Sequence, residues 1–301
     1  MRPSTSGSTS ARLMVLAWAA ACTATLAAPV GAQNPAPAPS TDVYIWAFGR
    51  PKPAVVNITN RAGYDNQPAW LGDTLVWTAQ VGGQFDIYQF GETPIHATPE
   101  SEYSAAATPD GNGYAVIRVE MDSTQRLWRF PSSGGTPSVV LADIKPVGYF
   151  AYLDANTLAL FVLGSPNTLQ IADTRTGKGT VVTTNIGRSI QHVPGGRRAS
   201  FTQRVAGKTL LETVDPTPRA DGSFAIDTIA ALPDSADYVV WKSATHLITG
   251  AGSRLMQLRL PSREWEVLAD LSGLGIRGIT RLALSPDGRA IAFVADEPRT
   301  P

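Results

Sequence analysis

The sequence has few of the residues that most often carry disulfide, metal or nucleic-acid chemistry. Its 301 residues include one cysteine and three histidines, and 25 basic residues balance 25 acidic ones. A single cysteine excludes a framework of internal disulfides. Balanced charge with no basic stripe makes nucleic acid a poor partner, so we expect none. After residue 32, no apolar run approaches the roughly eighteen residues that a membrane-spanning helix needs.

The first residues have the composition of an export signal. Arg2 and Arg12 are the only charges, and a short apolar stretch follows them before the small residues Val30-Gly31-Ala32. This stretch is too short for a membrane span. We therefore expect a signal peptide over residues 1–32, a mature chain that starts at Gln33, and a periplasmic or secreted protein.

Cys22 offers the alternative of a lipid anchor, because it follows small residues as the lipidated cysteine of a bacterial lipoprotein does. Ala19, three positions earlier, stands where such signals usually carry a bulky aliphatic residue, so we expect no lipid. Mass spectrometry of protein from the native host should find a mature N-terminus at Gln33. A diacylglyceryl group on Cys22 would show a lipoprotein signal instead.

One short unit recurs after a Pro- and Ala-rich linker at residues 33–41. Its clearest copies are Thr108-Pro109-Asp110-Gly111 and Ser285-Pro286-Asp287-Gly288, each followed by an apolar run. Four weaker copies have the same outline. The landmark positions of the six copies are 71, 109, 153, 194, 242 and 286, which lie 38 to 48 residues apart. Such a period, with several short strands in each unit, is typical of propeller blades.

Each part of the unit has a physical reason. Asp-Gly is a turn dipeptide, because glycine adopts a positive φ without strain and aspartate tolerates it. The β-branched and aromatic runs on either side suit strands of a sheet that is packed on both faces. Two further runs follow in each unit, Phe85–Tyr88 being one example. The sequence therefore predicts four strands in each blade.

The two ends of the repeat region complement one another. The last copy stops after its second strand, Ala290–Ala295, whereas the chain after the linker begins with the runs 42–46 and 54–59, a third and a fourth strand. We therefore predict an all-β fold, a six-bladed β-propeller over residues 42–297, with one blade shared by N- and C-terminal strands. Such closure hides sheet edges that would otherwise template aggregation.

These residues also resemble a known repeat. Ala69-Trp70 or Leu284-Ser285 precedes Pro-Asp-Gly or its weaker variant, and an apolar strand follows. This pattern resembles the TolB-type (WD40-like, PD40) repeat over about residues 42–297. The resemblance implies the propeller domain alone, without the α/β domain of the namesake or the hydrolase domain of related peptidases. Propellers of this type serve binding and several enzymatic roles.

No motif for catalysis stands in the structural context that it needs. Residues 273–278 match the letters of the dinucleotide fingerprint, but a strand and not a helix is expected after them. His96, His192 and His246 fall in different blades and at different positions of the repeat, which does not predict a shared metal. We predict no catalytic residue, no metal ligand and no cofactor. A single divalent cation in the central tunnel remains an alternative.

The candidate site is a surface at one mouth of the channel. Loops on a rigid scaffold gather binding residues, and in propellers those leading into the innermost strands surround this mouth. Counting five or six residues back from the landmarks selects the candidates Asp65, Asn66, Tyr103, Arg188, Asp237 and Arg281. The planar guanidinium groups of the two arginines would each donate paired hydrogen bonds to a carboxylate. The tyrosine would provide an apolar ring face and a hydroxyl.

The sequence thus predicts a non-enzymatic exported binding scaffold of the periplasm or cell envelope, with a protein or peptide partner. Two alternatives stay open at this stage. One is a propeller enzyme of the lactonase or polysaccharide-lyase type with a metal in the tunnel, and the other is a propeller that binds carbohydrate.

Overall fold

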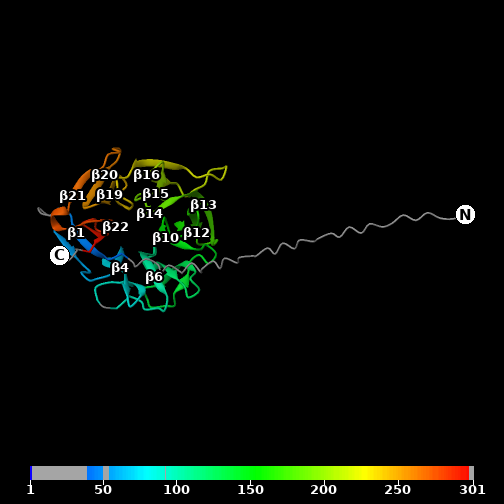
Figure 1. Cartoon of the computed structure of the whole chain (residues 1–301), viewed down its shortest axis with the longest axis horizontal. Coiled ribbons are helices and arrows are strands. Elements are labelled where there is room, and N and C mark those ends of the chain that lie inside the picture. Colours follow the sequence, from blue (N-terminus) through cyan, green and yellow to red (C-terminus); the bar gives the residue numbers. More distant parts are fainter. Residues whose placement is uncertain (2–38, 50–53, 92, 298–301) are drawn as a thin grey trace. The chain divides into compact units, whose positions relative to one another are not determined.

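The computed structural model describes Met1 and residues 39–49, 54–91 and 93–297. The predicted signal peptide after Met1, with Cys22, and the linker before residue 39 lie outside the described residues. Within this part of the chain, the strands form six antiparallel sheets that surround a common centre (Figure 1), and the one helix is the short 3-10 helix η1 (Ser272–Leu274). The predicted all-β, six-bladed propeller is confirmed. No helix of the described residues is long and apolar enough to cross a membrane.

Five blades are continuous in sequence, and their strands are given from the innermost outward. Blade one has β3 (Asp65–Leu71), β4 (Thr74–Val81) and β5 (Gln84–Tyr88). Blade two has β6 (Ser101–Ala107), β7 (Gly113–Val119), β8 (Gln125–Pro131) and β9 (Ser138–Val139). Blade three has β10 (Val147–Tyr152), β11 (Thr157–Val162), β12 (Thr168–Asp173) and β13 (Lys178–Thr184). Blade four has β14 (Ile186–His192), β15 (Ala199–Val205), β16 (Lys208–Val214) and β17 (Ile226–Ala231). Blade five has β18 (Val239–Ser243), β19 (His246–Ala251), β20 (Arg254–Arg259) and β21 (Glu266–Asp270).

Blade six joins the two ends of the repeat region, as predicted. Its strands are β22 (Thr280–Leu284), β23 (Ala290–Asp296), β1 (Thr41–Ala47) and β2 (Val55–Asn57). Strands β1 and β23 pair in antiparallel register from Thr41 with Asp296 to Ala47 with Ala290. Thr41, which the sequence placed in the linker, begins the strand because it pairs with Asp296, and its N–H also donates to the Gly63 carbonyl at 2.9 Å.

Blade one departs from the expected four strands. Its ladder has three, and the fourth segment contributes a single bridge between Tyr88 and Pro94. Proline has no N–H to extend a ladder, and here the next residue, Ile95, donates to the Ile87 carbonyl at 2.9 Å. The prediction of a fourth strand in blade one was therefore wrong, and His96 lies in a bend.

The six landmarks of the repeat mark the turns between the first and second strands of the blades. In the clearest copy, the Asp287 carboxylate accepts hydrogen bonds from the Ser285 hydroxyl at 2.6 Å and from the Arg289 N–H at 3.0 Å. Gly288 between them has a φ of 66°. Asp110 makes the equivalent contacts, with the Thr108 hydroxyl and the Asn112 N–H. These aspartates serve turn geometry, as expected from Asp-Gly.

Neighbouring blades are held together by apolar packing and by tryptophan hydrogen bonds. Leu127 of blade two packs with Leu160 of blade three in one buried cluster. The indole N–H of Trp241 donates to the Ser200 hydroxyl in blade four at 2.7 Å, and that of Trp70 donates to the Ala283 carbonyl in blade six at 3.2 Å. These contacts fix the innermost strands, which line the centre of the ring.

Candidate functional site

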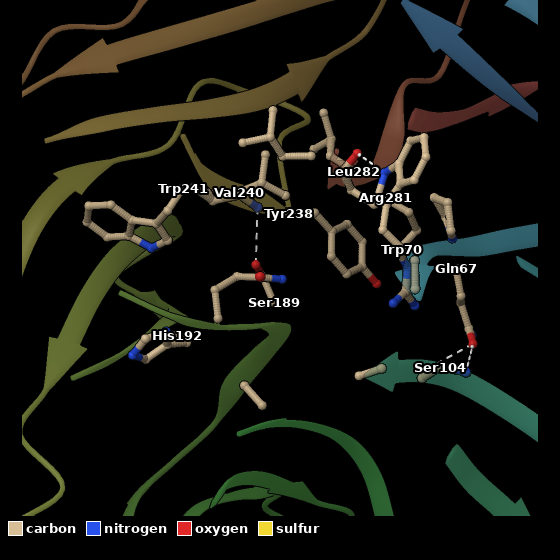
Figure 2. Close-up of a pocket in the computed structure, with 18 of the residues that line it drawn as sticks. Gln67, Trp70, Ser104, Ser189, His192, Tyr238, Val240, Trp241, Arg281 and Leu282 are labelled. Atoms are coloured by element: carbon tan, nitrogen blue, oxygen red, sulfur yellow. Dashed lines mark hydrogen bonds between the residues drawn. The ribbon is translucent and has the colours of Figure 1, made fainter. Parts of the chain in front are cut away.

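A cavity of about 630 Å³ lies at the centre of the ring, and all six innermost strands contribute to its lining. This volume is within the usual range for ligand pockets. Figure 2 shows Gln67, Tyr238 and Arg281 close together on one side of the view and His192 on the other. We call this cavity between the innermost strands the central channel.

Irregularities at the starts of the innermost strands direct polar side chains into this channel. The pairing register shifts beside Gln67, Ser104, Gly148, Arg188 and Arg281, near the start of five of the six innermost strands. A β-bulge re-aims side chains relative to regular pleating, and is often found beside functional sites. We call this level of the channel the bulge layer, and its members are Gln67, Ser104, Tyr149, Arg188, Tyr238 and Arg281.

Gln67 of blade one and Ser104 of blade two are joined by hydrogen bonds. Both have a positive φ, 53° and 55°, which non-glycine residues rarely adopt. The Gln67 side-chain carbonyl accepts hydrogen bonds from the Ser104 N–H at 2.8 Å, the Ser104 hydroxyl at 2.9 Å and the Thr78 hydroxyl at 3.1 Å. Its amide donates to the Tyr64 hydroxyl at 3.2 Å. The glutamine is thus used for structure.

Arg281 lies against two tyrosine rings. Its guanidinium carbon is 4.0 Å from the centroid of the Tyr238 ring and 4.7 Å from that of Tyr149. One guanidinium N–H donates to the Tyr149 hydroxyl at 2.8 Å. Burial raises the pKa of Tyr238, so this phenol stays protonated at neutral pH. The contacts hold the guanidinium in one orientation, with further N–H donors left for a ligand.

Arg188 is exposed and lies where two hollows meet. Together with Gln67 and Tyr149 it lines both the central channel and a neighbouring hollow of about 290 Å³. The pKa of Arg188 is raised, first by the Tyr149 phenol and also by Tyr238 and Asp237. Among the described residues, no carboxylate lies within 4.0 Å of the guanidinium of Arg188 or Arg281.

The described lining of the channel contains no aspartate and no glutamate. Besides the two arginines it carries Lys242, whose ammonium lies 3.8 Å from the centroid of the Phe48 ring, and His192, whose Nε2 lies 2.7 Å from the Gly196 carbonyl oxygen. Nowhere in the described chain do three His, Cys, Asp or Glu side chains gather as metal ligands. A divalent cation prefers several oxygen ligands, and this lining offers it cationic groups and no carboxylate, so the residues do not fit a metal site.

The six predicted site residues do not form one mouth. Arg188 and Arg281 line the channel, whereas Tyr103 lines the smaller hollow beside it. Asp237 is exposed, at 4.0 Å from Arg204, and lines a separate surface hollow.

Asp65 and Asn66 are buried at the contact with the closing strand. The Asp65 carboxylate accepts hydrogen bonds from Arg61 at 2.8 Å and from the Trp77 indole at 3.1 Å. The Asn66 amide donates to the Thr41 hydroxyl at 3.3 Å. The Thr41 hydroxyl in turn donates to the backbone carbonyl of Asp65 at 2.9 Å, so the Asn66 side chain and the Asp65 backbone contact the closing strand.

Sequence reasoning missed Tyr149 and Tyr238, the partners of Arg281. Counting a fixed distance back from each turn ignores the residues that a bulge adds to a strand. A detectable signal was present, because Tyr64, Tyr103, Tyr149 and Tyr238 recur near the starts of four innermost strands.

No family model and no curated protein matches the sequence. Among solved structures, a TolB-type protein from Agrobacterium tumefaciens is similar, with 17% identity and a TM-score of 0.64 over 87% of this chain and 99% of that one. A gluconolactonase from Xanthomonas campestris has 10% identity and a TM-score of 0.56, over 86% and 97% of the two chains. An oligogalacturonate lyase in complex with manganese has 12% identity and a TM-score of 0.53, over 81% and 80%.

At these identities the likeness concerns the fold, which is shared by binding proteins and enzymes alike. The chain therefore has the six-bladed fold of the TolB-type propellers, as its repeats predict.

Proposed function

We propose that the protein is a non-enzymatic binding scaffold of the bacterial cell envelope, and that its partner is a protein or peptide. The observation that supports this is the central channel, in which cationic and aromatic side chains project from rigid strands. A rigid, preorganised site lowers the ordering cost of binding. The export signal expected over residues 1–32 supports the location.

The chemistry of the lining favours binding over catalysis. General acid–base catalysis needs a positioned proton donor or acceptor, and hydrolytic enzymes often add a nucleophile or a metal-bound water. In the described lining, His192 is the only histidine, and it has no carboxylate beside it to orient its ring. A propeller enzyme is the rival function. Elemental analysis of the purified mature protein tests it, because a stoichiometric, tightly held metal would favour that enzyme.

Affinity capture tests whether the protein binds a polypeptide and whether the central channel is the binding site. The mature chain, used as bait in an envelope extract, should recover a polypeptide whose affinity falls about tenfold or more in the variant R188A/R281A, the usual scale for lost interface anchors. The matched control is R175A/R254A, which removes two positive charges from exposed positions outside the channel. The control should bind like the parent.

Melting curves of the same proteins separate binding from folding. Arg281→Ala removes the contacts with two tyrosine rings, so a destabilisation of about 1 kcal/mol is expected. Equal affinities of the parent and R188A/R281A would place the partner elsewhere on the propeller. A collapsed melt would show that these arginines are structural.

A further inference from the structure

The channel concentrates positive charge without a counter-charge of its own. Arg188, Arg281 and Lys242 all line it, and no aspartate or glutamate of the described lining faces them. Like charges within low-dielectric walls repel one another and focus a field that attracts anions. Elsewhere in the described chain, arginines such as Arg126 and Arg197 lie within 3 Å of a carboxylate. The channel arginines therefore have capacity for an external anion.

The geometry of the bulge layer suits a planar anion. Tyr149 and Tyr238 hold the Arg281 guanidinium in place, and such a fork matches the two oxygens of a carboxylate. Because the Tyr149 hydroxyl already accepts a hydrogen bond from Arg281, its own proton is available to an acceptor. Arg188 borders the same space from blade four. A carboxylate here would meet two cations and a hydroxyl donor.

The positive charges lie at two levels, which sets the length of the ligand. Tyr238, whose ring contacts Arg281, and Lys242 are four positions apart in blade five, so their Cα atoms are about 13 Å apart in an extended chain. A small organic acid does not span this distance, whereas about four residues of extended peptide do. Alanine and aromatic residues also line the channel.

We propose that the channel binds an acidic segment of the partner polypeptide, with one carboxylate at Arg188 and Arg281 and a later one at Lys242. This inference rests on the proposed function and specifies the chemistry of its ligand. It commits to a polypeptide carboxylate, and free organic acids are an outcome of the test.

The test uses two peptides that differ in charge alone. Titration calorimetry at low ionic strength compares acetylated, amidated tetraglutamate with the tetraglutamine peptide of the same length. The mature protein should bind tetraglutamate at least tenfold more tightly than tetraglutamine. The preference should disappear in R188A/R281A and persist in R175A/R254A, which has the same net charge. R281K should recover only part of the affinity, because an ammonium lacks the planar fork.

Each result decides the inference. Equal binding of the two peptides by the mature protein, or an unchanged preference in R188A/R281A, would overturn it. Binding of succinate with no binding of tetraglutamate would show that the site takes a free organic acid. A third outcome is that a captured partner needs both arginines for binding but tetraglutamate does not bind. The proposed function would then hold, and the inference that the ligand is an acidic segment would be wrong.

Discussion

Replacing Val43 by aspartate should destabilise the propeller by about 3–5 kcal/mol, a large part of the stability of an ordinary domain. Val43 lies at the middle of β1 and is fully buried. Its side chain belongs to a cluster that includes Leu75 and Trp77 of blade one and Val294 of the neighbouring strand. A carboxyl group there must lose its hydration or take up a proton, and both cost free energy.

The size of this effect follows from the position of β1 in the ring. The strand lies between β2 and β23, and its ladder of hydrogen bonds to β23 joins the N-terminal end of the described chain to the C-terminal strands of blade six. Beside Val43, the Tyr44 ring stacks on that of Phe293 with centroids 5.5 Å apart. Without β1, the edge of β23 would be open to other chains.

The neighbouring strand supplies a matched control. Val56 of β2 is 56% exposed, so the same substitution there places the carboxylate in water. V56D should change the free energy of unfolding by about 0.5 kcal/mol or less. Denaturant unfolding of the three proteins measures the difference. Deletion of residues 42–60 should go further and abolish cooperative unfolding. A deletion variant that melted like the parent would refute the shared blade.

The repeat could be read from the sequence because its signals are local. A Pro-Asp-Gly turn depends on contacts within five residues, such as those of Asp287, and these fix where each hairpin lies. Because the chain after the linker begins with two strands and the last copy ends after two, the sequence also predicted that they share one blade and close the ring. Blade one was the exception, because the effect of Pro94 on the ladder depends on which strand it would have to pair with.

The channel was less predictable, since it depends on register. A bulge adds residues to one strand only, and nothing in the composition near Gln67 or Ser104 marks a positive φ. Asp65 and Asn66 could not be recognised as buried, because the elements that cover them come from elsewhere in the chain. Arg188 and Arg281 were found by their place in the repeat. Their tyrosine partners come from other blades.

Glu102 should make the stability of the propeller depend on pH near neutrality. This residue lies in β6 and is 2% exposed. Burial, together with a hydrogen bond to Asp86, raises the pKa of Glu102 to about 7, although hydrogen bonds from Thr98 and Arg118 oppose the shift. The Arg118 guanidinium donates to the Glu102 carboxylate at 3.2 Å. The carboxyl therefore holds a proton in the fold at pH values where it is ionised in the unfolded chain.

The sign follows from proton linkage. Between pH 4.5 and about 7 the folded state binds more protons than the unfolded state at this residue, so the free energy of unfolding decreases as pH rises. The loss should amount to about 2–3 kcal/mol by pH 8. His246 acts in the opposite direction, because burial lowers its pKa and the folded state resists its protonation as pH falls. The contribution of Glu102 to the pH dependence of stability can therefore be measured only with a variant that changes Glu102 alone.

E102Q is that variant, because glutamine keeps the size of the side chain and does not titrate. Urea unfolding from pH 5 to pH 8 should give E102Q a flatter dependence than the parent, with the gap between the two changing by about 2–3 kcal/mol across the range. Below about pH 7 the Glu102 carboxyl already holds a proton, so glutamine removes no charge beside Arg118 there, and Glu100 still lies 3.6 Å from that guanidinium. E264Q changes an exposed glutamate and should follow the parent curve. Parallel curves for E102Q and the parent would mean that Glu102 is ionised in the fold, held so by Arg118.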